Sequence, residues 1–275
     1  MSYKTILVYL DGSDRNAHTL QVSCDLARKF DAHLAAIYSP ERQLFAPAMD
    51  AGASAMMALQ VEIEAQMQER ARGMLKAAEL QSGLTIEWRA ATGSAINNCI
   101  LHARHADLAV MMQENPSEKS GLDPSIPASV VVAAGRPVLV VPYAGEFRSC
   151  GESVLIAWSG TRESARAVAD ALPLMQRARE VSVVSFNPRG DTDWGEIPGA
   201  DIGLWLARHG VKVNVRQQKS EEIDVGNQIL SLAADLGTDL IVMGAYGHSR
   251  TFEFVLGGVT RTLLDTMTVP VLMSH

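Results

Sequence analysis

The sequence repeats itself after about half its length. An apolar segment, a Gly-Ser or Gly-Thr pair and a helical segment follow one another at residues 5–20 and again at 153–168. The later parts repeat in the same order, as DLAVM at 107–111 and DLIVM at 239–243, and then as RPVLVVP at 136–142 and TVPVLMSH at 268–275. A repeat this long is typical of two duplicated domains and not of a solenoid. We therefore predict one domain over residues 1–143, a polar linker, and a second domain over 152–275.

Each copy alternates short apolar segments with longer helical ones. In the first copy, apolar runs indicate strands at 4–10, 32–38, 84–90, 108–112 and 138–141, with helices between them. Strands that alternate with helices predict a parallel sheet, because each right-handed crossover carries the chain back over one face. Helices then cover both faces of the sheet. The predicted fold class is α/β, with two tandem doubly wound domains.

One helix sets the two copies apart. It is predicted over residues 53–81, whereas the second copy is shorter at this place. The side chains that share one face at helical spacing are Leu59, Ile63, Met67, Met74 and Ala78. The methionines of this segment (Met49, Met56, Met57, Met67 and Met74) could form an adaptable binding surface, but we expect them, with this face, to pack into the core. In the second copy, a surface loop around Trp194 is expected to replace this helix.

The stretch from Leu240 to Thr262, LIVMGAYGHSRTFEFVLGGVTRT, is rich in glycine. Its apolar start predicts a buried strand that stops at Gly244, and helical spacing at 259–266 predicts a short helix. Glycine lets backbone N–H groups approach a ligand closely, and helix N-termini favour phosphate. The spacing Gly244-x2-Gly247-x9-Gly257-Gly258 fits neither a Walker loop nor the dinucleotide pattern G-x-G-x-x-G. It indicates either a phosphate cradle or glycines that only end the strand and turn the chain.

The same stretch resembles the nucleotide loop of the universal stress protein family, G-x2-G-x9-G-(S/T), and the likeness extends over essentially the whole chain. It departs from the family pattern at Gly258, where a Ser or Thr hydroxyl would otherwise meet a phosphate. The resemblance implies a five-stranded parallel sheet in each domain, with strand order 3-2-1-4-5 and helices on both faces. Strands one and four are then neighbours, and a ligand would bind outside their carboxyl ends.

The resemblance also implies a binding site for ATP or a related adenine nucleotide in the second domain. It places Met243 beside the adenine and Ser159 near the ribose or base. The residues placed around the phosphates are Gly244, Gly247, Gly257, Gly258, Val259 and Thr260, with His248 and Arg250 as charge-bearing candidates near the same loop. His248 and Arg250 could equally be exposed loop residues with no role in binding.

The two domains do not carry the same half-site. Asp11 follows the first strand, where the family has an Asp that helps to hold the adenosine, but residues 113–119 (QENPSEK) contain no glycine. Their Glu114 and Glu118 would repel phosphate. The second domain has the glycine loop, but Ser159 replaces the Asp and the bulky Trp158 precedes it. Trp158 could stack on a base, and packing in the core or at its rim is the simpler expectation. We expect a nucleotide site in the second domain only.

Charge and composition limit the kinds of binding partner and the cellular compartment that we expect for this chain. The net charge is −7 and neither half of the chain is basic, which argues against nucleic acid as a main partner. No apolar run is long enough for a membrane span, and the N-terminus leads straight into a strand without the apolar region of a signal peptide. Three scattered cysteines cannot make a disulfide framework. We therefore expect a cytoplasmic protein that does not associate with membranes.

The fifth strands of the two domains, Val138–Val141 and Val271–Met273, are expected to pair, because open apolar edges need covering. In the resembled family these strands form such contacts. Further self-association through edge strands, as a homodimer, is also expected. We expect no enzyme activity beyond very slow ATP hydrolysis, and no metal, because no base, metal ligand or arginine is placed for the reaction. The alternative is a regulator that acts through protein–protein contacts and has vestigial sites, which Gly258, Ser159 and Trp158 favour.

Overall fold

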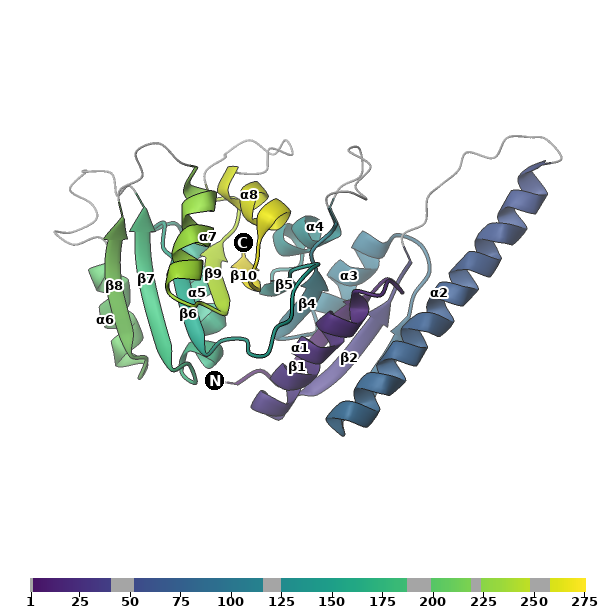
Figure 1. Ribbon diagram of the computed structural model, residues 1–275, viewed down its shortest axis with the longest axis horizontal. Helices are drawn as coiled ribbons and strands as arrows, with labels where there is room; N and C mark the ends of the chain where they lie inside the picture. Colours follow the sequence, from purple (N-terminus) through teal and green to yellow (C-terminus); the bar gives the residue numbers. More distant parts are fainter. Residues whose placement is uncertain (1, 41–51, 116–124, 187–198, 219–223, 248–257) are drawn as a thin grey trace.

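The computed structural model describes residues 2–40, 52–115, 125–186, 199–218, 224–247 and 258–275. Its strands form one ten-stranded sheet in the order β3-β2-β1-β4-β5-β10-β9-β6-β7-β8 (Figure 1). Each half of the chain supplies five of these strands, and the order 3-2-1-4-5 occurs once in each half. The predicted fold class is confirmed.

Helices and strands alternate throughout both halves. Domain one consists of β1 (Thr5–Leu10), α1 (Asn16–Phe30), β2 (His33–Tyr38), α2 (Gly52–Ser82), β3 (Ile86–Ala90), α3 (Ala95–Ala103), β4 (Leu108–Met112), α4 (Ile126–Ala133) and β5 (Val138–Val141). Domain two consists of β6 (Ser153–Ala157), α5 (Arg162–Met175), β7 (Glu180–Phe186), α6 (Ala200–Arg208), β8 (Val213–Gln218), α7 (Val225–Asp235), β9 (Leu240–Gly244), α8 (Gly258–Thr266) and β10 (Val271–Ser274). Neighbouring strands within each domain are parallel.

Alternate residues of the strands point to two separate cores, one on each face of the sheet. In β1, Ile6 and Val8 belong to one hydrophobic cluster, whereas Leu7 belongs to the other. The first cluster is completed by α1, α2, α5 and α6, and the second by α3, α4, α7 and α8. Because strands buried on both faces must be apolar at every position, the central strands read as continuous hydrophobic runs.

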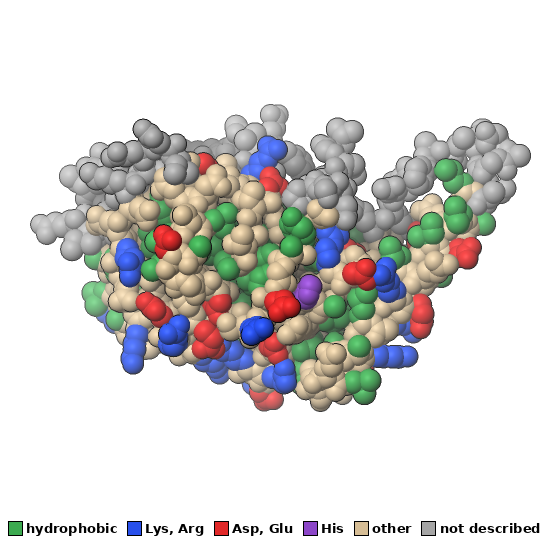
Figure 2. All heavy atoms as spheres, in the orientation of Figure 1, with side chains coloured by type: hydrophobic (Ala, Val, Ile, Leu, Met, Phe, Trp, Pro, Cys, Tyr) green, Lys and Arg blue, Asp and Glu red, His purple; other side chains and the backbone are tan. Residues whose placement is uncertain are grey.

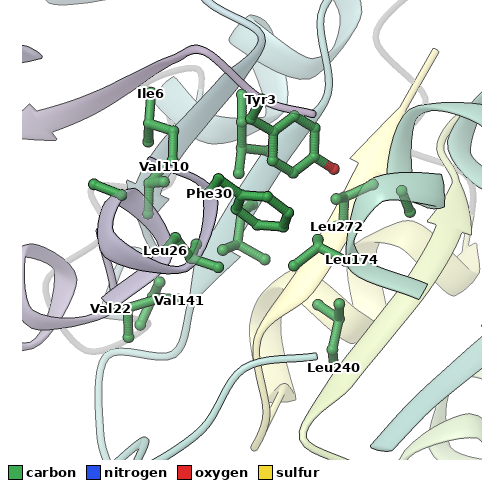
Figure 3. Packing of buried hydrophobic residues seen from close by; sticks show 14 of the residues in the cluster. Tyr3, Ile6, Val22, Leu26, Phe30, Val110, Val141, Leu174, Leu240 and Leu272 are labelled. Carbon is green, nitrogen blue, oxygen red and sulfur yellow. The ribbon is translucent and has the colours of Figure 1, made fainter. Parts of the chain in front are cut away.

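The two domains join edge to edge within the chain. Strands β5 and β10 pair antiparallel, with Leu272 opposite Leu139 and Val271 opposite Val140, and all four side chains are fully buried. Tyr3, Phe30, Leu174 and Leu272 gather at this junction (Figure 3). The predicted pairing of the fifth strands is confirmed. Because β5 and β10 pair with each other, neither is a free edge. Self-association through an edge strand would have to use β3 or β8, the outer strands of the joined sheet.

Helix α2 matches the predicted span, but the expected packing of its apolar face is correct only for its C-terminal half. Ala71, Leu75 and Ala78 are buried in the first cluster. Leu59 and Ile63, by contrast, are 57% and 48% exposed. The helix extends beyond α1 and β2 (Figure 1), so its N-terminal part has little to pack against, and hydrophobic side chains are visible along it at the right of Figure 2. Met56 and Met57 are exposed there as well, so core packing was the wrong expectation for them.

The corresponding place in domain two holds a short helix. Helix α6 spans nine residues between β7 and β8, where α2 spans thirty-one in domain one. Trp194 and the rest of 187–198 lie outside the described residues. The replacement of the long helix is therefore not only a loop, because α6 contributes Leu206 to the first cluster.

Candidate functional site

The carboxyl ends of β6 and β9 lie side by side in the middle of domain two. These strands are paired in parallel, with Ala157 opposite Met243 at the end of the pairing. On one side of this pair the sheet continues with β7 and β8, and on the other side it continues with β10. This is the switch point of a doubly wound sheet, and in such folds ligands bind in the crevice outside these strand ends.

The turn after β6 is held by hydroxyl groups. Thr161 is the N-cap residue of α5, and its side chain accepts a hydrogen bond from the Ser164 backbone N–H at 3.3 Å. The Ser159 and Thr161 hydroxyl oxygens are 3.1 Å apart and share a hydrogen bond. Trp158 packs at the rim of the first hydrophobic cluster, in agreement with the expected packing role. Ser159 is partly exposed beside it at the mouth of the crevice.

Gly244 ends β9 directly against the start of α5. A Cβ atom at this position would lie 2.5 Å from the Glu163 carbonyl carbon and nearer still to the Ser164 backbone nitrogen. No side chain fits between these backbones. The close approach that requires this glycine is therefore to the protein's own helix, so a phosphate is not needed to explain Gly244.

Gly247 lies against side chains and not backbone. A Cβ atom here would be 2.9 Å from Glu163 Oε2 and 3.0 Å from Thr161 Oγ1. Between the two glycines, Tyr246 adopts a left-handed backbone with φ 65°, which is uncommon for a bulky residue. Burial, followed by the nearby charge of Glu114, raises the pKa of Tyr246. The loop is thus tied to α5 by Gly244, Gly247 and the groups that face them.

Glu163 is the residue of this crevice that the sequence analysis missed. Its side chain is only 6% exposed, and it pairs with the largely exposed Arg162. Burial raises the pKa of Glu163, but hydrogen bonds from Arg162, from its own backbone and from Thr161 outweigh burial and hold the pKa below its ordinary value. An ionised carboxylate is therefore enclosed beside Gly247. An acid in the first turn after an N-cap Thr is a visible helix-start signal, but its burial depends on the loop packed over it.

Helix α8 follows the glycine-rich loop in the chain. Gly258 is its first residue in the described part of the chain, and a Cβ added there would meet no described atom within 4 Å. Val259 is partly buried and Thr260 is buried, in the first turn of the helix. Met243, placed beside the adenine by the resemblance, is 5% exposed and packs in the second cluster, so it offers a ligand little surface. His248, Arg250 and Gly257 lie outside the described residues.

The equivalent place in domain one is occupied by the protein's own groups. Glu114 follows β4, and its carboxylate accepts a hydrogen bond of 2.7 Å from the Ile126 backbone N–H at the start of α4. The Ser125 side chain caps the same helix. Asp11 Oδ1 accepts from the Ser13 backbone N–H at 2.8 Å within its own turn. A helix start that is already capped by a carboxylate is unsuited to a phosphate.

The described residues also bear on metal binding and on membrane insertion. Within the described ranges, no group of three or more His, Cys, Asp or Glu side chains is arranged to hold a metal ion. None of the described helices combines the length and the apolar character that a membrane crossing requires.

Comparison with known proteins places the chain in one family. The family model described as the universal stress protein family matches residues 2–142 and again 152–275. No curated protein matches. Among solved structures, a universal stress protein from Archaeoglobus fulgidus DSM 4304 is 17% identical, with 98% of this chain and 95% of that chain covered and a TM-score of 0.74. A putative universal stress protein from Pseudomonas aeruginosa UCBPP-PA14 is 15% identical, with 99% and 93% covered and a TM-score of 0.59. The chain belongs to the universal stress protein family and carries the family's domain twice.

Proposed function

We propose that this chain is a cytoplasmic stress-response protein that binds ATP or a related adenine nucleotide in domain two and not in domain one. The observation that carries the proposal is the contrast between two equivalent helix starts. Helix α4 begins on the carboxylate of Glu114, whereas no described atom lies within 4 Å of the Cβ position at Gly258, the first described residue of α8. A helix N-terminus that follows a glycine loop at the switch point of the sheet suits a phosphate. The unpaired cysteines agree with a reducing compartment.

In this proposal the ligand lies between the Ser159 turn, Gly247 and the first turn of α8. Ser159 faces the ribose or base, and the backbone from Gly258 to Thr260 faces the phosphates. Gly257 and His248 belong to the same loop in the sequence. We propose binding without efficient turnover, because hydrolysis of ATP needs a metal or a positioned base and the described part of the crevice supplies no metal-ligand cluster.

A first experiment adds charge to the loop. Gly247→Glu places a second carboxylate next to Glu163, so ATP affinity measured by titration calorimetry should fall about 100-fold. The control is Gly73→Glu on α2, where an added Cβ atom meets no described atom within 4 Å and the change in net charge is the same. Gly73→Glu should bind as the unmodified protein does. An unchanged affinity in Gly247→Glu would remove the loop from the site.

A second experiment restores the hydroxyl that the family carries. Gly258→Ser should bind ATP about tenfold more tightly, because a hydrogen bond to a charged group contributes about 1.5–3 kcal/mol. Among the described residues, no atom lies within 4 Å of the Cβ position at Gly258, so the added Cβ atom displaces none of them. Gly258→Ala is the matched control, since it adds the Cβ atom without the hydroxyl. Equal affinities of the Ser and Ala variants would contradict a phosphate at this helix start.

The second candidate function is regulation through protein–protein contacts. It is favoured by the N-terminal part of α2, where Met56, Met57 and Val61 are 59%, 66% and 65% exposed. Exposed apolar side chains that gather on one element are typical of interaction sites. Absence of any nucleotide in the purified protein, together with no heat of binding at millimolar ATP, would favour this function over the first.

A further inference from the structure

We infer that Glu163 selects ligands by charge, so that the domain-two site binds adenosine or its monophosphate in preference to free ATP. This inference rests on the proposed function, since it concerns the same crevice. It adds a specificity-determining residue that neither the glycine pattern nor the family resemblance identifies.

The position of Glu163 is fixed from three sides. Its backbone carbonyl carbon lies against Gly244, with 2.5 Å to the position that a Cβ atom would take. Its Oε2 lies against Gly247, with 2.9 Å to the corresponding position. The Thr161 hydroxyl oxygen also lies against Gly247, with 3.0 Å to that position, and the Ser159 hydroxyl oxygen is 3.1 Å from it. A line of oxygen atoms therefore runs from the mouth of the crevice to the glycine loop.

The charge of this carboxylate is only partly offset. Arg162 is its ion-pair partner, but the Arg162 side chain is 81% exposed and its charge is screened by water. The Glu163 side chain itself is 6% exposed, so its field acts through protein and not through solvent. Hydrogen bonds from Arg162, from its own backbone and from Thr161 keep the group ionised by holding its pKa below the ordinary value despite burial.

Domain one has the opposite charge at the same place. In the repeat that aligns residues 5–20 with 153–168, Arg15 occupies the position of Glu163. Arg15 is the N-cap residue of α1, whereas Glu163 lies in the first turn of α5, and a helix follows the first strand in both domains. The fold therefore does not require an acid at this position, which leaves the charge of Glu163 free to serve ligand selection.

The expected selectivity follows from Coulomb's law. Each added phosphate brings negative charge toward the same loop, so repulsion from Glu163 rises from adenosine to ATP. Carboxylate and hydroxyl oxygens accept hydrogen bonds, and ribose hydroxyls donate them. The nucleoside end of the ligand is therefore attracted to the groups that repel the phosphates. A divalent cation bound to the phosphates offsets the repulsion, so Mg²⁺ should improve ATP binding.

The test compares ligands and one variant by titration calorimetry. Adenosine, AMP, ADP and ATP are titrated into the full chain in the presence of EDTA, and ATP is titrated again with Mg²⁺. The unmodified protein should bind adenosine or AMP more tightly than free ATP. Glu163→Gln should bind free ATP about tenfold more tightly, with no corresponding gain in adenosine affinity. Glu152→Gln is the control, because it removes the same charge from the start of β6.

The outcomes separate this inference from the proposed function. If Glu163→Gln binds ATP no better than the unmodified protein, while both bind it, the inference fails and the nucleotide site stands. The inference also fails if Glu152→Gln gives the same gain, since net charge alone would explain it. If neither protein binds any of the four ligands, both fail. The ranking of ligands by the unmodified protein needs no variant, so a preference for free ATP overturns the inference even if Glu163→Gln does not fold.

Discussion

Replacing Gly244 by alanine should destabilise the ligand-free protein by about 3 kcal/mol or more. The new methyl carbon would lie 2.5 Å from the Glu163 carbonyl carbon and 2.9 Å from Glu163 Cβ. The nearest of these atoms belong to the backbone, so they cannot rotate away as the end of a side chain can. Helix α5 would have to move off β9, and this would disturb the packing of its own buried residues, such as Ala167 and Val168. Urea denaturation followed by circular dichroism measures the change.

Gly258→Ala is the control, because the same methyl group meets no atom of the described residues within 4 Å at that position. Its free energy of unfolding should differ from that of the unmodified protein by less than about 0.5–1 kcal/mol. The comparison separates two roles of glycine in one loop. A Gly244→Ala protein that is as stable as the unmodified one but no longer binds ATP would assign this glycine to the ligand and contradict the packing role.

Gly244 and Gly258 illustrate how much of the candidate site can be predicted from the sequence. Their spacing correctly indicates a strand that ends at Gly244 and a helix that starts after the second glycine pair. The pattern cannot say what approaches each glycine, because that depends on elements distant in the sequence. The neighbour of Gly244 is the start of α5, about 80 residues earlier in the chain. Glu163 was missed for the same reason, since its burial arises only when this loop packs on α5.

The repeat determined the fold more completely than it determined the site. The alternation of strands and helices follows from apolar runs that recur in the same order, whereas the strand order was implied by the family resemblance. The pairing of β5 with β10 was also implied by the resemblance, and apolar edges that need covering give it a physical reason. The exposure of Leu59 and Ile63 did not follow, because helical spacing defines a face without showing how far the neighbouring elements extend. Local periodicity therefore located the helices and strands correctly, but it did not predict which part of a long helix is buried.

Shortening Leu272 to alanine at the domain junction should cost about 3 kcal/mol of folding stability. Leu272 is fully buried, pairs with Leu139 across the antiparallel β5–β10 contact, and lies near Tyr3, Phe30 and Leu174 (Figure 3). The Arg177 guanidinium of domain two stacks over the Phe30 ring of domain one, 4.6 Å from its centroid, and Tyr3 donates a hydrogen bond of 2.7 Å to the Asp170 carbonyl. The junction is therefore as well packed as a domain core.

The consequence is that both domains should lose stability together, although the change lies in β10. In hydrogen exchange followed by mass spectrometry, peptides from β1 and from β6 should both exchange faster in Leu272→Ala, because neither domain keeps a covered edge once the junction opens. Leu204→Ala on α6 is the control, since Leu204 is 52% exposed and its loss should change stability by less than about 0.5 kcal/mol. Faster exchange confined to domain two would mean that the domains fold independently and that the continuous sheet adds little to the stability of either. Faster exchange in both would make the paired fifth strands the element through which one domain supports the other.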